Sequence, residues 1–261
     1  EEAGYLAGKG IKELILVSQE ATLWGYDLPE KPDIVRLLKE LDQIKDVRWI
    51  RLMYLYPAQV SDELIRYLAA DNKTLNYFDL PLQHVNTEIL KAMKRLFDRE
   101  QTDRLVDRIR ELSPDAVLRT TLIAGFPGET EEQFEEMVEF VSKNRFDRLG
   151  VFAYSPEEGT PAEQMPNQVP DVMREMRVDR IMSLQREIAF RKNNSLIGNV
   201  EEVIIDSVKS DGPAVGRTRG DCPEIDQEVF VSGGTSQVGD ICWVRIEGVE
   251  GYDLIGTRMP E

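Results

Sequence analysis

The sequence between residues 13 and 155 alternates short apolar runs with amphipathic segments, and this alternation restricts the fold more than any other feature. Nearly continuous apolar runs are typical of parallel strands that are buried on both faces. Such runs occupy residues 13–19, 47–56, 77–82, 116–125 and 148–155. Apolar side chains at helical spacing fill the segments between them, at residues 32–44, 61–70, 86–95, 99–112 and 130–144. The alternation therefore predicts an α/β fold built on a parallel sheet or barrel.

Five strands are too few for a closed eight-stranded barrel. The chain begins with "EEAGYLAGKG", which lacks a starting methionine and reads as part of a helix, so we expect further sequence upstream. One more strand there would complete an open barrel. We therefore predict an open, parallel partial TIM barrel whose first strand is missing from this chain. In such folds the ligand sits at the carboxyl ends of the strands.

The pattern changes after a proline-containing linker at 161–170. Residues 171–193 form a long amphipathic pattern that predicts a linking helix. Short β-like runs separated by glycine turns follow it and predict a small antiparallel β-barrel. We expect two domains, a core at 1–192 that includes the linking helix and an all-β domain at 193–261.

Charge and cysteine content restrict the partners. The net charge of −16 opposes binding to nucleic-acid phosphates and favours a basic partner. No apolar run is long enough to span a membrane. Cys222 and Cys242 lie far apart in sequence, which predicts free thiols in a reducing cytoplasm. A single histidine, His84, excludes a multi-histidine metal site within this chain.

Amides and glycine turns follow several of the predicted strands and should meet at one rim. Gln19 follows the first strand, Gln83 and Asn86 follow the third, and the turn "GFPGE" with Gly125 and Gly128 follows the fourth. Each has an ordinary structural alternative, because Asn86 could cap the next helix and the glycines could serve only a tight turn. Together they suit a ligand with ribose hydroxyls, a purine and amino-acid ends. A nucleoside triphosphate fits less well, because no GxxxxGK[ST] motif is present.

Charged side chains inside the strand patterns leave two interpretations open. Arg51 and Arg119 would face the barrel interior, where a lone charge is costly. Arg119 could form a structural ion pair, for instance with Asp79, or it could hold a ligand carboxylate with its fork of donors. His84 could likewise be a hydrogen-bonded structural residue or part of the site.

Five motifs in order resemble the methylthiotransferase branch of the radical S-adenosylmethionine enzymes. They are "SQEATLWGYDL", "RLMYLYP", "LPLQHVNTEILKAMKR", "LRTTLIAGFPGETEEQF" and "FAYSPEEGTPA". The β-rich end resembles the TRAM domain that ends these enzymes. Within the branch, "LPLQH" and "YSPEEGT" are most similar to the group that methylthiolates an aspartate of the twelfth small-subunit ribosomal protein. The tRNA-modifying relatives carry different versions of both motifs.

The resemblance implies a reaction that this chain does not complete alone. In the family, a 4Fe-4S cluster cleaves S-adenosylmethionine to a radical that takes hydrogen from the aspartate β-carbon. Sulfur associated with a second 4Fe-4S cluster is inserted there, and another S-adenosylmethionine supplies the methyl group. The CxxxCxxC motif of the first cluster and the domain of the second are absent from these 261 residues, and we expect them upstream. We therefore predict that this chain alone is inert.

The resemblance also assigns cofactor-binding positions and leaves the catalytic residues unknown. Gly125, Gly128 and Glu129 match the strand-end motif that lines the adenine and ribose, and Gln19 matches the group that receives the methionyl end. The resemblance places three further residues on ligand-facing positions of the third and fourth strands, namely Gln83, Asn86 and Arg119.

The charge of the β-rich end separates the candidate substrates. Residues 195–261 hold five basic and thirteen acidic side chains, a net charge of −8. An RNA-binding surface should be basic, so we expect a basic ribosomal protein to dock on this domain and no nucleic-acid partner. Two alternatives stay open: a tRNA-modifying methylthiotransferase, and a non-catalytic scaffold that only docks proteins.

Overall fold

The computed structural model describes residues 1–208 and 212–260. Lys209, Asp211 and Glu261, which contribute to the charge count above, lie outside the described residues. The elements in chain order are α1 (Glu2–Gly8), β1 (Glu13–Leu16), η1 (Ala21–Leu23), α2 (Ile34–Asp42), β2 (Trp49–Leu52), η2 (Pro57–Gln59), α3 (Asp62–Ala69), β3 (Tyr77–Gln83), α4 (Thr87–Ala92), α5 (Arg99–Leu112), β4 (Val117–Ala124), α6 (Glu131–Asn144), β5 (Arg148–Ala153), α7 (Asp171–Leu196), β6 (Val200–Ser207), β7 (Ala214–Thr218), β8 (Val229–Ser232), β9 (Ile241–Glu250) and β10 (Asp253–Arg258).

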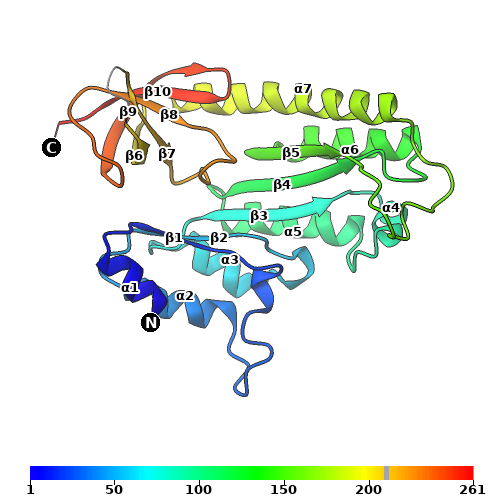
Figure 1. Ribbon diagram of the computed structural model, residues 1–261, viewed down its shortest axis with the longest axis horizontal. Helices are drawn as coiled ribbons and strands as arrows, with labels where there is room; N and C mark the ends of the chain where they lie inside the picture. Colours follow the sequence, from blue (N-terminus) through cyan, green and yellow to red (C-terminus); the bar gives the residue numbers. More distant parts are fainter. Residues whose placement is uncertain (209–211, 261) are drawn as a thin grey trace.

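The alternating part of the sequence folds into parallel strands with helices between them, as predicted. β1 pairs with β2, and β3, β4 and β5 form a three-stranded sheet, with every pair parallel. Figure 1 shows β3 and β4 pointing in one direction, with their carboxyl ends at the end of the molecule away from the β-barrel. Leucine, isoleucine, valine and phenylalanine side chains between the strands and helices form one large buried core. The open α/β half-barrel is confirmed.

Two local features shorten or interrupt the predicted strands. β2 ends at Leu52, because Tyr54 has a left-handed backbone with φ of 57° and cannot continue a strand. Between β2 and β3 the sheet is held mainly by isolated bonds, such as the Leu55 amide to the Asp79 carbonyl (2.9 Å). In β3, Pro81 has no amide hydrogen, and the pairing with β4 shifts register between Leu80 and Gln83.

Helix boundaries follow the capping residues that the sequence contains. Ser61 accepts a hydrogen bond from the Leu64 amide at the start of α3 (3.1 Å). Thr130 and Gln133 form the capping box that begins α6, each bonding to the backbone of the other. These bonds satisfy amides of the first helical turn, which fixes where α6 leaves the turn that follows β4.

The β-rich end forms a closed five-stranded barrel in the order β10-β8-β7-β6-β9. The predicted small β-barrel is confirmed, and one pair of neighbours departs from the expected antiparallel arrangement, because β8 and β10 pair in parallel. The remaining neighbours are antiparallel. A closed ring with an odd number of strands cannot alternate direction throughout, so at least one parallel pair is required.

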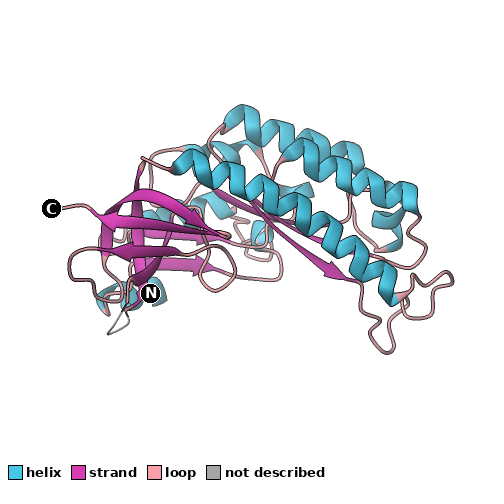
Figure 2. Cartoon of the chain, turned by 90° about the horizontal axis from the view of Figure 1, so that it is seen from above, coloured by secondary structure: helices cyan, strands magenta, loops and turns pink. Residues whose placement is uncertain are grey.

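Helix α7 connects the two halves of the molecule. It starts near the carboxyl ends of the core strands and runs back to the β-barrel along one side of the sheet (Figure 1). Figure 2, seen from above, shows α7 beside another long helix and the barrel strands grouped beyond its far end. In the described part of the chain, no helix combines the length and the apolar composition that crossing a lipid bilayer requires.

Candidate cofactor site

A cavity of about 620 Å³ opens at the carboxyl ends of β3, β4 and β5. Gln83, Thr121, Ile123 and Phe152 line it from the strands, and the loops after β5 and α4 complete it. Its volume lies in the range of small-molecule and cofactor pockets. The mixture of apolar walls and a few polar groups suits a nucleoside with an amino-acid tail.

The turn at residues 125–129 contributes Phe126 to the lining of this cavity, whereas Gly125, Gly128 and Glu129 are not among the lining residues. Gly125 and Gly128 both have left-handed backbones, with φ of 78° and 84°. The Gly128 amide donates to the Asn167 carbonyl (2.9 Å), which ties the turn to the loop before α7. Phe126 lines the cavity and meets the ring of Tyr154 edge-on, with centroids 5.2 Å apart. The two glycines thus let the backbone reverse at the rim.

Glu129 faces the interior of the protein and holds this turn. Its carboxylate accepts the Gly125 amide (2.9 Å) and lies 3.2 Å from His84 Nε2 through the same oxygen, Oε2. The other oxygen accepts a bond from Arg177 Nη1 at 2.7 Å. The carboxylate is fully buried. The Glu129 carboxylate therefore holds the turn from the protein interior.

His84 is a hydrogen-bonded structural residue, which confirms one of the two sequence interpretations. The Asn86 amide donates to His84 Nδ1 (2.9 Å), so that nitrogen carries no proton. The ring proton then lies on Nε2, where it can be donated to Glu129. The buried ring thereby connects the end of β3 to the turn after β4.

Asn86 caps α4, as the alternative interpretation predicted. Its Oδ1 accepts the amides of Glu88 (3.0 Å) and Ile89 (3.2 Å). Gln133 Nε2 donates to the same oxygen, and Asn86 Nδ2 donates to Glu136. These internal partners use both atoms of the amide.

The two predicted glutamines lie in different surroundings. Gln83 ends β3 with a left-handed φ of 66° and lines the cavity. Gln19 is exposed in the segment after β1 and is not among the residues that line the cavity. A left-handed backbone in a non-glycine residue at a rim is a feature often found at functional sites.

Arg119 forms the predicted ion pair with Asp79, with Nη1 and Oδ1 2.8 Å apart. Its Nε lies 3.3 Å from Asp226 of the β-barrel. Asp79 is fully buried and also accepts the Tyr54 amide (3.0 Å). Arg119 points to the same face as Thr121 and Ile123, but its guanidinium lies between two carboxylates.

Arg51 is also held by internal partners. Its Nε donates to Glu13 Oε1 (2.9 Å), and its guanidinium stacks over the ring of Tyr77 at 4.5 Å. Glu13 in turn pairs with Arg217 of the β-barrel. The two strand arginines that the sequence singled out therefore both connect to the contact between core and barrel.

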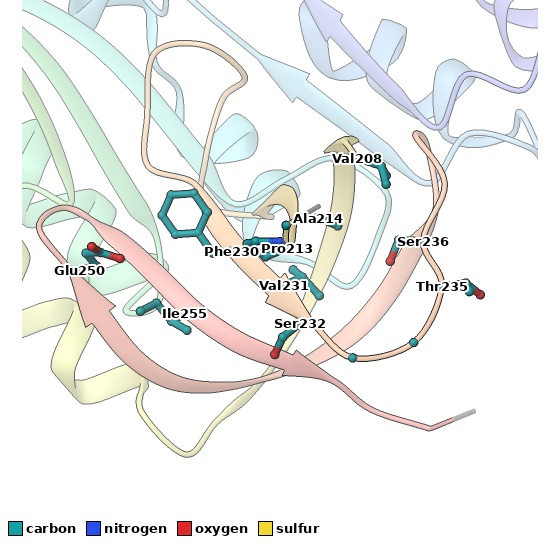
Figure 3. A pocket seen from close by; sticks show the side chains of 13 residues that line it. Val208, Pro213, Ala214, Phe230, Val231, Ser232, Thr235, Ser236, Glu250 and Ile255 are labelled. Carbon is teal, nitrogen blue, oxygen red and sulfur yellow. The ribbon is translucent and has the colours of Figure 1, made fainter. Parts of the chain in front are cut away.

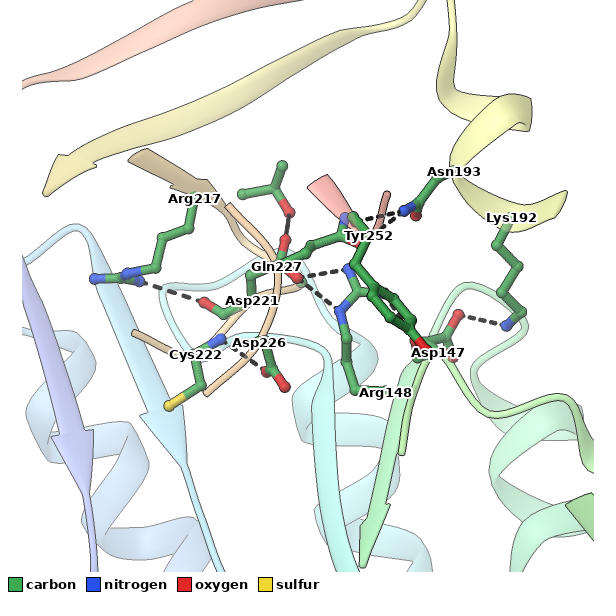
Figure 4. Close-up of polar contacts among 12 residues, drawn as sticks. Asp147, Arg148, Lys192, Asn193, Arg217, Asp221, Cys222, Asp226, Gln227 and Tyr252 are labelled. Carbon is green, nitrogen blue, oxygen red and sulfur yellow. Dashed lines mark hydrogen bonds and ion pairs between the residues drawn. The ribbon is translucent and has the colours of Figure 1, made fainter. Parts of the chain in front are cut away.

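Acidic side chains of the β-barrel pair with arginines of the core. Asp221 accepts a bond from Arg148 Nε (2.6 Å), and Figure 4 shows this pair beside the Cys222 amide, which donates to Asp226 (2.9 Å). Burial raises the pKa of Asp221 although Arg148 lies beside it. Glu202 and Arg48, 2.5 Å apart, form another pair of this kind, as do Asp226 and Arg119 described above. Some acidic side chains of the barrel are therefore paired with arginines of the same molecule.

The β-barrel carries a second cavity, of about 850 Å³. Figure 3 shows Phe230, Val231 and Ile255 together with the hydroxyls of Ser232 and Ser236 around it. Glu250 is the only charged side chain among the lining residues that the structure describes. Among the described lining residues, none offers a cation to a phosphate.

The sequence interpretation missed the contribution of α7 to the first site. Arg177 reaches Glu129, and Arg174 Nη1 donates to the Tyr154 carbonyl (3.0 Å). Both arginines are almost completely buried. The available signal was their spacing, since they occupy the same helix face as the apolar Ile181 and Ile188.

Comparisons with known proteins agree with this arrangement. Residues 1–141 match the family described as the radical SAM superfamily, and residues 197–259 match the TRAM domain. Proteins named "Ribosomal protein uS12 methylthiotransferase RimO" are 46% identical in Pelotomaculum thermopropionicum and 47% identical in Symbiobacterium thermophilum. These alignments cover 99% and 98% of this chain but 59% and 54% of the relatives, so the chain spans a little over half of their length.

A solved structure shows the same fold at low identity. The archaeal Elp3 of Methanocaldococcus infernus, with an N-terminal deletion, aligns with a TM-score of 0.50 and 18% identity. The alignment covers 67% of this chain and 45% of that one. The superfamily match includes more than half of the residues, among them the turn after β4 and the end of β3. The chain belongs to the radical SAM superfamily.

Proposed function

We propose that this chain is the cofactor-binding body and TRAM tail of a methylthiotransferase that modifies an aspartate β-carbon of ribosomal protein uS12. The observation that carries the proposal is the identity of 46–47%, over nearly the whole chain, to proteins named uS12 methylthiotransferases. The half-barrel with a strand-end cavity of nucleoside size supports it. The core would comprise residues 1–192, with the linking helix at 171–193, and the TRAM domain residues 193–261.

The strand-end cavity is the proposed site for S-adenosylmethionine. Its volume of about 620 Å³ and its apolar walls fit the adenosine, and the positive φ angles of the two glycines let the chain reverse beside it. When bound, S-adenosylmethionine supplies the methyl group and, together with iron–sulfur chemistry, the means to activate the aspartate carbon. The chain's own residues bind and orient this cofactor.

The predicted site residues divide into two groups by their contacts. We assign direct contact with the cofactor to Gln83, Gly125 and Gly128, and we keep Gln19 as the partner of the methionyl end. Glu129 and Asn86 support the site from inside through the turn and the helix cap. Arg119 supports the adjoining strands through Asp79.

Superfamily membership implies S-adenosylmethionine and 4Fe-4S chemistry, and two clusters are our proposal for the complete enzyme. The chain has only two cysteines, Cys222 and Cys242, too few for a thiolate triad. Both are free and buried, Cys242 inside the β-barrel and Cys222 where the barrel packs against the core. Cluster ligands therefore have to come from sequence outside these 261 residues, and we place the enzyme in the reducing cytoplasm.

The proposed substrate is a basic ribosomal protein, with the acidic TRAM domain as its docking surface. Three acidic side chains of that domain already pair with core arginines, so the docking surface would rest on the exposed acids, such as Glu224, Glu228 and Glu250. A tRNA substrate is the alternative. The lack of cationic side chains among the described residues that line the barrel cavity favours the protein.

An activity assay tests the proposal. Purified uS12 or tRNA is incubated with S-adenosylmethionine, iron, sulfide and reductant. The catalyst is either this chain or the chain extended to its relatives' full length. The extended protein should add one methylthio group to uS12 at an aspartate, and a uS12 variant with asparagine there should stay unmodified. Modification of tRNA in place of uS12, or turnover by the 261 residues alone, would contradict it.

A further inference from the structure

We infer that Arg177 of α7 is a positioning residue for the cofactor turn: through Glu129 it fixes the Gly125 amide and, with His84, the shape of residues 125–128. This inference rests on the proposed function, because the turn is the proposed binding wall for S-adenosylmethionine. The residue lies far along the chain from the turn and contacts it at Glu129, through the buried carboxylate and the backbone carbonyl of that residue.

The buried carboxylate of Glu129 needs a compensating positive charge. The side chain of Glu129 is fully buried, and an unpaired carboxylate in such a place is strongly unfavourable. Among the described residues, its ion-pair partners are Arg177 and, if protonated, His84. Because His84 Nδ1 accepts the Asn86 amide, the ring is neutral as bonded. Arg177 is then the group that compensates the charge.

The Glu129 carboxylate is bonded directly to the turn. Glu129 Oε2 accepts the Gly125 amide at 2.9 Å, at the point where β4 ends and the left-handed backbone begins. Arg177 Nη1 also lies 3.3 Å from the Glu129 carbonyl. The same guanidinium therefore contacts both the side chain and the backbone of the residue that closes the turn.

Arg177 is itself held in place by its neighbours. Its Nη2 pairs with Glu131 at 3.1 Å, and its guanidinium stacks over the ring of Phe134 at 5.1 Å. At the other end of α7, Asn193 donates to the Tyr252 carbonyl of the β-barrel (2.8 Å). The helix is thus anchored at both ends, and Arg177 acts from a fixed support.

Arg180 provides a matched control on the same helix. It pairs with Glu135 and stacks over Phe134 at 5.4 Å, so it shares the helix, the ring and the charge of Arg177. Its side chain is 48% exposed, and within the described residues its ion pairs are with Glu131 and Glu135 and not with Glu129. Removing it changes the helix surface without touching the turn.

The experiment compares Arg177→Met, Arg177→Lys and Arg180→Met in this chain. Hydrogen–deuterium exchange reports the Gly125 amide, and calorimetry reports binding of S-adenosylmethionine. We expect exchange at Gly125 to accelerate in Arg177→Met by about tenfold to a hundredfold, the effect of losing a charge-assisted hydrogen bond. S-adenosylmethionine should bind correspondingly more weakly. Arg177→Lys should restore part of both, and Arg180→Met should match the unmodified chain.

The outcomes separate positioning from general destabilisation and from the proposed function. Wild-type exchange at Gly125 in a folded Arg177→Met variant would overturn the inference, as would equal acceleration throughout β4 and α6. If Arg177→Met does not fold, Arg177→Lys provides the test. Unchanged exchange at the Gly125 amide together with unchanged S-adenosylmethionine binding in Arg177→Lys would then overturn the inference. If the exchange pattern is as expected but the unmodified chain and the extended protein bind no S-adenosylmethionine, the positioning holds and the proposed function fails.

Discussion

Replacing Gly125 by alanine should damage the protein more than the same change at Gly128, although both glycines lie in one turn. Both have left-handed backbones, with φ of 78° and 84°. A Cβ atom at Gly125 would lie 2.4 Å from Arg174 Cγ and 3.1 Å from Arg174 Cβ. A Cβ atom at Gly128 would have no neighbour within 4 Å. The pair thus separates backbone strain from steric overlap.

The magnitudes follow from these two terms. A left-handed backbone costs an alanine about 1–2 kcal/mol, and this cost applies at both positions. Overpacking a buried site adds about 1–3 kcal/mol, and this applies only at Gly125. Arg174 cannot simply move aside, because it is 8% exposed and bonded to the Tyr154 carbonyl. Gly125→Ala should therefore lose about 2–5 kcal/mol of unfolding free energy and Gly128→Ala about 1–2 kcal/mol.

Urea unfolding of the two variants and of Gly125→Ala combined with Arg174→Ala measures these terms. The double variant removes the Cγ and Cδ atoms of Arg174, so it should couple favourably and lose less than the sum of the two single variants. Equal losses for the two glycine variants, or strictly additive losses in the double variant, would refute the steric reasoning.

Three further predictions concern the supports of the site and the barrel. Asn86→Ala should cost about 1–2 kcal/mol through the lost cap of α4, measured by urea unfolding, and a loss near zero would contradict the cap. Asp221→Ala leaves Arg148 without its buried partner and should cost about 3–5 kcal/mol by the same measurement, whereas under 1 kcal/mol would contradict the pairing. Burial raises the pKa of Cys222 to about 11, so its alkylation at pH 8 should be far slower than that of a free thiol and should speed up only on unfolding. Between the ordinary thiol pKa and about 11, the unfolded chain loses the Cys222 proton while the folded chain keeps it, so this thiol lowers the free energy of unfolding as pH rises. A folded chain that is alkylated as fast as the unfolded chain would contradict the burial of Cys222.

The fold was largely predictable because its signals are local and periodic. The fourth predicted strand, 116–125, corresponds to Val117–Ala124, and the capping box of Thr130 and Gln133 begins α6 as expected. The strand over 47–56 was predicted too long, since the left-handed backbone of Tyr54 is imposed by contacts such as the bond from its amide to Asp79. The parallel pair of β8 and β10 depends on closure of the whole ring.

The site was predictable as a place and less so as a set of side chains. Sequence position assigns Gln83 and the glycine turn to one rim, and the structure places Gln83 and Phe126 of that turn in the lining of the cavity. It cannot show that Glu129 turns inward, because its partner Arg177 follows 48 residues later. Arg119 likewise meets Asp226 across 107 residues, and no local pattern specifies such a pair.

Photo-crosslinking with an azido-adenine analogue of S-adenosylmethionine tests the central claim most directly, because it locates the adenine in the folded chain. We predict labelled peptides from residues 121–129 and 152–165, two segments that contain residues lining the strand-end cavity, with competition by unmodified S-adenosylmethionine. Labelling confined to residues 213–236 or 250–255, which line the larger cavity of the β-barrel, would contradict the assignment of the cofactor site.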